Sequence, residues 1–130
     1  MVLDSRFIME YFHSESNETK QKATKKLKEL LQRKEGILPT IVISETIQTI
    51  CEQIGKEEAE ICYANLTQIE LKIQTLTSPI AKQAGLLRCK YRNIPMGDCI
   101  IAATAIANQA VILSDDPHFD VIQETKRNWI

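Results

Sequence analysis

The sequence predicts an α/β fold in a single domain, with a small parallel sheet flanked by helices. Two observations lead to this prediction. Short apolar segments suited to strands alternate with longer segments of helical periodicity, which is the pattern of α/β proteins. The continuous apolar run "AVILS", residues 110–114, is typical of an inner parallel strand, because such strands are covered on both faces. The 130 residues suffice for one such domain, residues 1–130, with its own core.

Composition narrows the class of protein. Sixteen Lys and Arg against seventeen Asp and Glu give a net charge of -1, so any surface that binds phosphate must be local. The four cysteines form no C-x-x-C pair, which favours reduced cysteines over a zinc site. The longest nearly apolar stretch, residues 99–113, is too short to span a membrane. We therefore expect a soluble cytoplasmic protein without a membrane partner.

The first third of the chain predicts one strand and two helices. The apolar residues 1–3 form a short strand that stops at Asp4, and helical spacing follows it. Asn17 is predicted to cap a long amphipathic helix that Gly36 terminates. The outer face of this helix is basic and most simply serves solubility, with RNA contact as the alternative; it carries Lys20, Lys22, Lys25, Lys26 and Lys28.

The middle of the chain predicts three helices and a strand. Pro39 and Thr40 open a helix, and its expected inner stripe is Ile43, Ile47, Ile50, Cys51 and Ile54. A further helix covers residues 57–66, and the alternating segment 69–76 suits a strand with one covered face. Another helix runs from Ser78 and Pro79 towards Tyr91.

The last third predicts a buried helix followed by the inner strand. The segment "DCIIAATAIAN", which begins at Asp98, is apolar nearly all round and therefore reads as a central helix. Strand 110–114 comes directly after it.

Acidic residues follow both the first and the last of these strands. Asp4 follows the first strand, and Asp115 and Asp116 follow the last. Ligands of open parallel sheets bind outside the carboxyl ends of the strands, and Asp98 opens the buried helix towards the same crevice. Each acid also has an ordinary explanation, because Asp4 and Asp98 can cap helices and Asp-Asp-Pro is good turn chemistry.

Glu45 is not selected by periodicity. It projects away from the predicted stripe, as an exposed glutamate would. Ile41 and Val42 lie on its own side one turn earlier, so the start of this helix is expected to be covered on both faces.

Four segments resemble those of the PIN-domain ribonucleases in order and approximate spacing, and most closely those of the toxin subunits of VapBC-type toxin–antitoxin pairs. These are "VLDSRFIMEYF", "TIVISETIQTI", "GDCIIAATAI" and "ILSDDPHF". The resemblance covers essentially the whole chain, and its most specific part is "GDCIIAATAI" followed by an apolar strand and "SDDPHF". It implies a PIN-like domain that cuts RNA to leave a 5′-phosphate. It also implies a homodimer and a small antitoxin that inserts a segment into the acidic crevice.

The resemblance also assigns roles to residues. It implies an acidic quartet that binds metal, with Asp115 as a substitute or helper: Asp4, Glu45, Asp98 and Asp116. Ser5 and Ser114 match small hydroxyl positions that assist water at the metal site. Arg6 departs from the family pattern, since many relatives have a small polar residue there.

Chemistry supports a metal independently of the resemblance. Converging carboxylates repel one another unless a cation joins them. Oxygen ligands favour Mg²⁺ or Mn²⁺ over zinc, and phosphodiester hydrolysis is the reaction that most needs such a site. We expect Asp4, Asp98 and Asp116 as ligands, with Glu45 as a ligand or as the group that orients the attacking water.

Four cations lie near these acids along the chain and are candidates for binding the phosphate backbone: Arg6, Arg88, Lys90 and Arg92.

Three alternatives remain at this point. One is a metal-free ribonuclease that uses His13 and His118 as general acid and base, although His118 is also suited to anchoring a loop. The second is a non-catalytic α/β domain that binds RNA or a protein. The third is a phosphoryl-acceptor receiver domain, which fits less well because its acid pair should follow the first strand.

Overall fold

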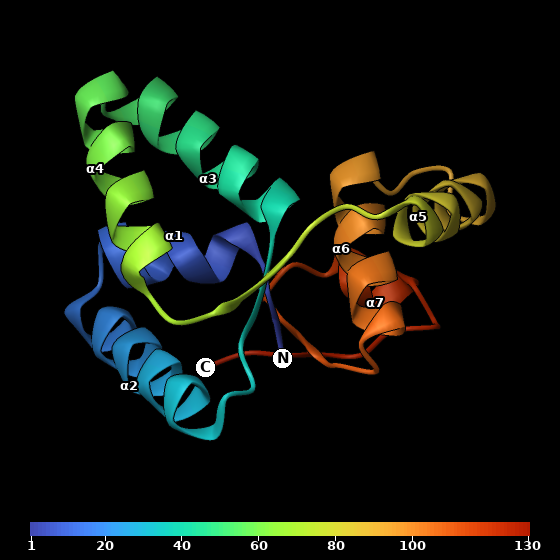
Figure 1. Ribbon diagram of the computed structural model, residues 1–130, viewed down its shortest axis with the longest axis horizontal. Coiled ribbons are helices and arrows are strands. Elements are labelled where there is room, and N and C mark those ends of the chain that lie inside the picture. Colours follow the sequence, from blue (N-terminus) through green and yellow to red (C-terminus); the bar gives the residue numbers. More distant parts are fainter.

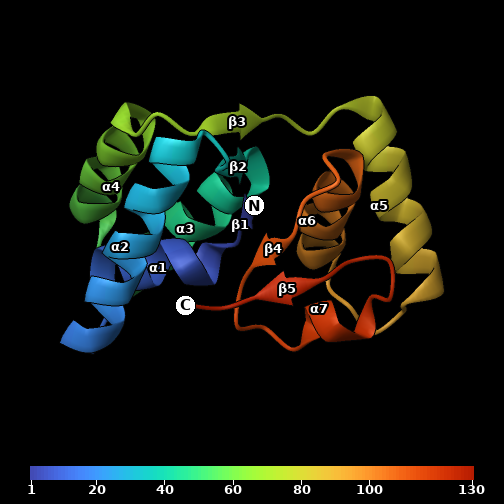
Figure 2. The same ribbon diagram turned by 90° about the horizontal axis from the view of Figure 1, so that it is seen from below.

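The computed structural model describes residues 1–130 and confirms the α/β fold with a small parallel sheet (Figures 1 and 2). All five strands run parallel, in the order β3-β2-β1-β4-β5. The strands are β1 Val2–Leu3, β2 Ile37–Pro39, β3 Lys72–Gln74, β4 Ile112–Leu113 and β5 Arg127–Asn128. The helices are α1 Ser5–His13, α2 Asn17–Arg33, α3 Thr40–Gln53, α4 Lys56–Gln68, α5 Ser78–Lys90, α6 Met96–Ala107 and α7 His118–Val121.

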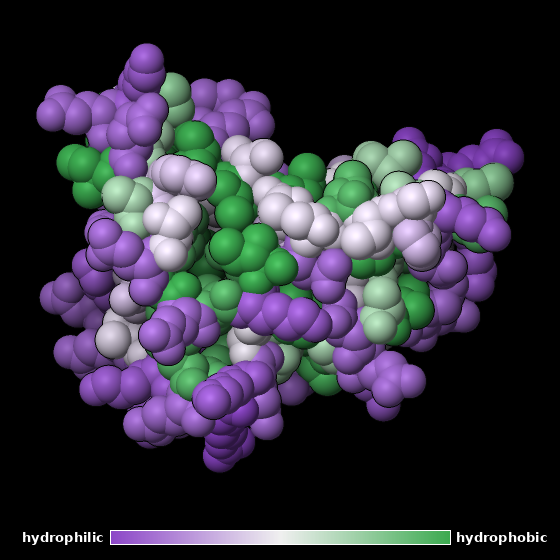
Figure 3. All heavy atoms as spheres, viewed as in Figure 1, coloured by the Kyte–Doolittle hydropathy of each residue, from purple (hydrophilic) through white to green (hydrophobic).

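The helices form two groups on either side of the sheet. Helices α1 to α4 gather on one side and α5 to α7 on the other, and both termini lie near the middle (Figures 1 and 2). The outline of the molecule is indented between the α3–α4 arm and the α5–α6 arm (Figure 3). No helix is long and apolar enough to cross a membrane.

The predicted centre of the fold is confirmed. Strands β1 and β4 pair with each other, and all their side chains are buried. Helix α6 buries Cys99 and Ile101 through Ala105, as its apolar sequence predicts. Asp4 and Asp98 follow or begin these central elements, so the core determines their positions.

Three elements were not expected from the sequence. Strand β2 has only three residues and ends at Pro39, which is also the N-cap of α3. Proline has no backbone N–H to donate to a neighbouring strand, so it is suited to the end of a strand. Strand β5 is a polar edge strand, and α7 spans four residues. None of the three is long enough to show a period.

The predictions for the two ends of α2 were wrong. Ser16, not Asn17, caps the helix, since its hydroxyl accepts a hydrogen bond from the Thr19 N–H. Lys34 ends the helix in the left-handed conformation, with φ of 55°. Gly36 is instead needed for packing, because a Cβ there would lie 2.4 Å from Leu71 Cδ2.

The expected covered face of the segment 69–76 was also wrong in part. Strand β3 is an edge strand that pairs only with β2, and Ile73 and Leu76 are nearly half exposed. Figure 3 shows hydrophobic residues over the middle of this face of the molecule and hydrophilic ones around its margin. We call Ile73 and Leu76 the β3 apolar patch.

The predicted stripe of α3 was wrong in part: Ile50 is buried and Ile43 and Ile47 pack against the core, as expected. The buried residues of this helix are Val42, Thr46 and Ile50, whereas Cys51 and Ile54 are exposed. The covered face is therefore rotated from the expected one. Glu45 lies beside Val42 and Thr46 on this covered face, not opposite it.

Candidate metal centre

Acidic side chains from four separate segments meet at the carboxyl edge of the sheet. Asp4 follows β1, Asp116 follows β4, Asp98 lies in the first turn of α6, and Glu45 lies on α3. The carboxylates of Asp4, Asp98 and Asp116 are all close enough to Glu45 to raise the pKa of its carboxyl. We call these four residues the acidic cluster. The structure thus brings together the quartet that the resemblance implies.

Asp4 is both a helix cap and a member of the cluster. It is 2% exposed, and its Oδ1 accepts a hydrogen bond of 2.8 Å from the Ser5 N–H at the start of α1. Its Oδ2 accepts a bond of 2.6 Å from the Ser114 hydroxyl. Burial raises the pKa of Asp4 and the neighbouring Asp98 and Asp116 add to the rise, while the two hydrogen bonds oppose it. The hydrogen bonds therefore fix the position of the Asp4 carboxylate, but the pKa of its carboxyl stays raised.

The two serines support this arrangement to different degrees. Ser114 is fully buried, and its hydroxyl also accepts a bond of 3.0 Å from the Asp116 N–H. It therefore joins two acids of the cluster. The Ser5 hydroxyl lies 3.4 Å from Asp4 Oδ1, a longer contact.

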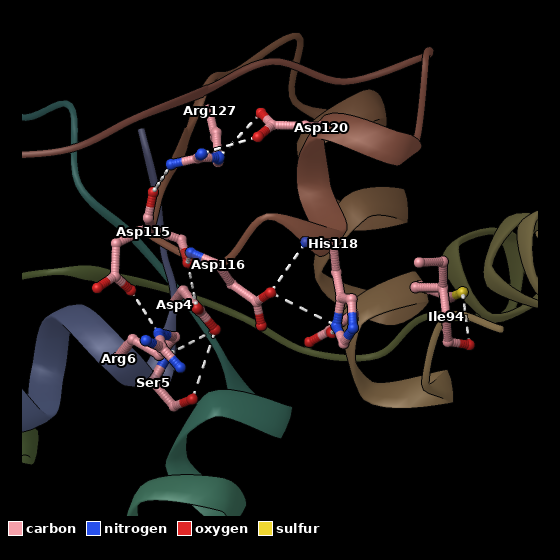
Figure 4. A network of polar contacts seen from close by, with 12 residues as sticks. Asp4, Ser5, Arg6, Ile94, Asp115, Asp116, His118, Asp120 and Arg127 are labelled. Atoms are coloured by element: carbon pink, nitrogen blue, oxygen red, sulfur yellow. Dashed lines mark hydrogen bonds and ion pairs between the residues drawn. The ribbon is translucent and has the colours of Figure 1, made fainter.

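His118 joins the other two aspartates (Figure 4). Its Nδ1 lies 2.8 Å from Asp98 Oδ2, and its backbone N–H donates to Asp116 Oδ1 at 2.9 Å. Burial raises the pKa of Asp98, and the His118 contact opposes this rise. The hydrogen bond to Asp98 in turn raises the pKa of His118. His118 thus anchors the loop beside the site, and its ring nitrogen lies within 4.8 Å of carboxylate oxygens of both aspartates.

Glu45 is the most strongly perturbed acid. Burial, and then the neighbouring carboxylates Asp4, Asp98 and Asp116, raise its pKa to about 7. Its Oε1 is buried without any hydrogen-bond partner. Its Oε2 fits against Gly97, where an added Cβ would lie 2.9 Å away.

These observations fit a divalent cation. A buried carboxylate oxygen without a donor is unfavourable, and so are several carboxylates that raise one another's pKa. A cation would satisfy both. The oxygen donors of the clustered carboxylates suit Mg²⁺ or Mn²⁺.

Asp115 turns away from this cluster (Figure 4). It forms an ion pair with Arg6, and both side chains are more than one third exposed. The structure therefore places Asp116, not Asp115, beside Asp98. Arg6 is held by Asp115 at the margin of the cluster.

The other predicted cations lie at the end of α5 and in the loop after it. Lys90 is 3.5 Å from Glu124, and Arg92 is exposed without an ion pair. Lys90 and Arg92 line a pocket that His118 also lines. Burial raises the pKa of the Cys99 thiol, and Arg88, which is partly buried, lies close enough to oppose this rise.

Two supporting residues were missed in the sequence. Arg127 pairs with Asp120 at 2.7 Å and donates to the Ser114 carbonyl oxygen at 3.3 Å. It therefore helps to hold the backbone of Ser114 in place. Gly97 leaves room for Glu45. Neither has a local signal, because each acts across segments that are distant in sequence.

The structure does not bring the two histidines together. His13 ends α1, eight residues or about 12 Å along the helix axis from Ser5, and lies 3.7 Å from Glu58. His118 contacts Asp98 instead. This geometry gives no support to the metal-free alternative.

Comparisons with known proteins agree with the fold. The VapBC2 complex of Rickettsia felis, solved with a promoter DNA fragment, contains a chain with a TM-score of 0.81 at 17% identity, over 98% of this chain and 96% of that one. FitAcB of Neisseria gonorrhoeae gives 0.71 at 21% identity, over 98% and 96%. VapC20 of Mycobacterium tuberculosis, a toxin that cleaves the sarcin–ricin loop, gives 0.72 at 16% identity, over 94% of both chains. No curated protein sequence matches this one.

A family model settles the classification. The PIN domain model matches residues 1–124, which is nearly the whole chain. The parallel sheet and the acids at its carboxyl edge agree with the match. The chain belongs to the PIN domain family.

Proposed function

We propose that this protein is a metal-dependent endoribonuclease of the cytoplasm, which hydrolyses RNA phosphodiester bonds with Mg²⁺ or Mn²⁺ and is the toxin of a toxin–antitoxin pair. The main observation behind the proposal is the acidic cluster, with its unpartnered buried oxygen on Glu45. Membership of the PIN domain family and the likeness to VapC structures support it.

The carboxylates of Asp4, Asp98 and Asp116 would hold the cation, and Glu45 would complete the set or orient the attacking water. When bound, the cation offsets the clustered negative charge, lowers the pKa of the attacking water and stabilises the leaving oxygen.

The protein's own residues fix the geometry. Ser114 aligns Asp4 and Asp116 through hydrogen bonds of 2.6 and 3.0 Å, and His118 holds Asp98. Without a cation, burial and the neighbouring carboxylates raise the pKa of Glu45 to about 7. A bound cation would favour the ionised form, so that the carboxylate could hold the cation or accept a hydrogen bond from the attacking water. Such preset positions reduce the reorganisation needed at the moment of reaction.

Substrate binding would use the cations around the cluster. Arg92 is free to pair with phosphate, and Lys90 needs only to leave a 3.5 Å contact with Glu124. Arg6 would exchange its partner Asp115 for phosphate, and Arg88 would add positive charge nearby. These contacts would position RNA without reading its sequence.

We also propose two protein partners. A further structural neighbour, with a TM-score of 0.65 at 18% identity, is a toxin–antitoxin complex from Klebsiella pneumoniae, which supports a small antitoxin as a partner of this chain. A homodimer is supported by the exposed β3 apolar patch, since such surfaces mark contacts between proteins.

The test is cleavage of a mixed pool of single-stranded and structured RNA by purified protein. We expect cutting with Mg²⁺ or Mn²⁺, no cutting with EDTA, and at least about a thousandfold loss in Asp98→Asn. Cutting that survives EDTA and the mutation would reject the metal mechanism.

The matched measurement is Mn²⁺ binding by calorimetry. Wild-type protein should bind Mn²⁺, and Asp98→Asn should bind it at least about tenfold more weakly. A non-catalytic binding domain predicts equal binding in both proteins and no cleavage product in either.

A further inference from the structure

A second concave site adjoins the acidic cluster. It lies between the loop after α5 and helix α7, and its lining residues are Lys90, Tyr91, Arg92, Asn93, Ile94, His118 and Val121. We call it the α5–α7 pocket. His118 is shared by the pocket and the cluster, because it lines the pocket and its Nδ1 contacts Asp98. Figure 4 shows His118 with Asp116 on one side and Ile94 on the other.

The lining combines three kinds of chemistry. Val121 is 53% exposed although it is apolar, and it lines the pocket together with Tyr91 and Ile94. Asn93 is exposed and offers both an amide donor and a carbonyl acceptor. Arg92 supplies a positive charge without an ion pair.

This combination fits an unpaired nucleotide. A nucleobase has an apolar face that packs on side chains, and an edge that an amide can read through two hydrogen bonds. Its phosphate matches Arg92. A base in a duplex is stacked and cannot enter such a pocket, so the RNA must be single-stranded there.

The walls of the pocket are also fixed. The Tyr91 hydroxyl contacts the Glu124 carboxylate and accepts a hydrogen bond of 3.2 Å from the Gln123 N–H. These contacts tie the α5 end to the segment after α7. A pocket that is fixed before binding loses less entropy when a ligand enters.

We propose that the α5–α7 pocket binds the base of the nucleotide next to the scissile phosphate and selects single-stranded RNA by the identity of that base. The inference rests on the proposed nuclease function. His118 lines the pocket and its Nδ1 lies 2.8 Å from Asp98, so a base in the pocket would be close to a phosphate at the cluster. A protein segment as the occupant is less favoured, because the pocket pairs its apolar wall with an unpaired arginine and an amide at its rim.

The experiment maps cut sites in a randomised single-stranded RNA pool. Wild-type protein should prefer one base, or one pair of bases, at a single position beside the cut. Asn93→Ala should reduce this preference at least about tenfold while other positions keep theirs, since a good bidentate contact is worth about that much. Val121→Trp should fill the pocket and lower cleavage of the preferred RNA at least about tenfold.

Two exposed positions on α4 provide matched controls. Asn65→Ala removes an amide and Ile61→Trp adds an indole, both far along the chain from the pocket. Neither should alter the cut pattern. If Asn93→Ala and Val121→Trp behave like these controls, the base subsite is rejected although the nuclease function stands.

A binding measurement tests the base subsite even if the proposed nuclease function fails. Short fluorescent single-stranded RNAs that differ at one base are titrated into the Glu45→Gln protein, so that cutting does not interfere. Discrimination between bases that Asn93→Ala removes would support the subsite, even if the wild-type protein proved unable to cleave. Equal affinity for all bases in both proteins would overturn it.

Discussion

The acidic cluster and the basic face of α2 both concentrate charge, but the fold treats them differently. The α2 lysines come from one helix and are exposed, with a single ion pair of 3.2 Å between Lys22 and Glu18. The acids of the cluster come from four segments and are largely withdrawn from water. Charge in water is screened and adaptable, whereas charge that converges in a partly buried place changes the pKa of its neighbours. The candidate centre is therefore formed by the four scattered acids of the cluster and not by the run of lysines on α2.

The strongest test of this contrast compares neighbouring aspartates. Asp116→Asn should lower RNA cleavage at least about a thousandfold, since it removes a carboxylate from the cluster. Asp115→Asn should lower it no more than about tenfold, because Asp115 faces Arg6. Lys25→Gln on α2 should change it less than about twofold. Equal losses in the two aspartate variants would contradict the placement of Asp116.

The second test uses the pH dependence of stability without metal. Between pH 4.5 and about 7, folded protein keeps a proton on Glu45 that the unfolded chain releases. The free energy of unfolding should therefore fall as pH rises through this window, by about 2 kcal/mol after allowance for solvent screening. Urea unfolding at a series of pH values with EDTA measures it.

Glu45→Gln is the control for that measurement. Its free energy of unfolding should fall less over the same window, and it should exceed the wild-type value above pH 7. Saturating Mn²⁺ should reverse the order, because a bound ligand stabilises the wild-type fold. A Glu45→Gln protein that is less stable than the wild type at high pH without metal would contradict the prediction that the ionised Glu45 destabilises the metal-free fold.

The third test concerns the space beside Glu45. Gly97→Ala places a Cβ 2.9 Å from Glu45 Oε2, so the carboxylate must shift. We expect Mn²⁺ affinity to fall about tenfold by calorimetry, comparable to the loss of a supporting contact. Gly85→Ala on α5 meets nothing within 4 Å, and it should add about 0.5–1 kcal/mol of stability without changing affinity.

The smallest effect belongs to α2. Ser16→Ala removes the capping hydroxyl and should lower the free energy of unfolding by about 1 kcal/mol in urea. Asn17→Ala, one residue on, should change it by only a few tenths. Neither should alter cleavage, because a solvated helix can lose stability without disturbing the cluster. A larger loss of unfolding free energy in Asn17→Ala than in Ser16→Ala would show that Asn17 is the cap, as predicted from the sequence.

The sequence predicted those elements whose own residues show a strong pattern. Helix α6 and strand β4 were found because their apolar residues are continuous, which reflects burial on every side. Strand β5 and helix α7 left no signal, since two to four mostly polar residues show no period. On α3, apolar residues on two sides allowed two choices of buried face, and the chosen one was right at Ile50 and wrong at Cys51 and Ile54.

The same distinction applies to the site. Asp4, Asp98 and Asp116 follow from the rule that acids at the carboxyl ends of parallel strands share a crevice. Glu45 came only from family resemblance, because its helix periodicity pointed elsewhere. The loop-anchoring role of His118 was predicted from the sequence, although its partner Asp98 was not. The contributions of Arg127 and Gly97 required contacts that local sequence does not encode.

The sequence by itself determined the α/β class, the buried centre and the acids near it, because buried helices and strands have continuous apolar residues that can be recognised along the chain. Only the tertiary structure decided which acids meet, which of Asp115 and Asp116 faces Asp98, and how the α5–α7 pocket joins the cluster through His118. These depend on the strand order and on the rotation of α3 against its neighbours. Both are fixed by packing between segments far apart in sequence, so they become visible only when the chain is folded.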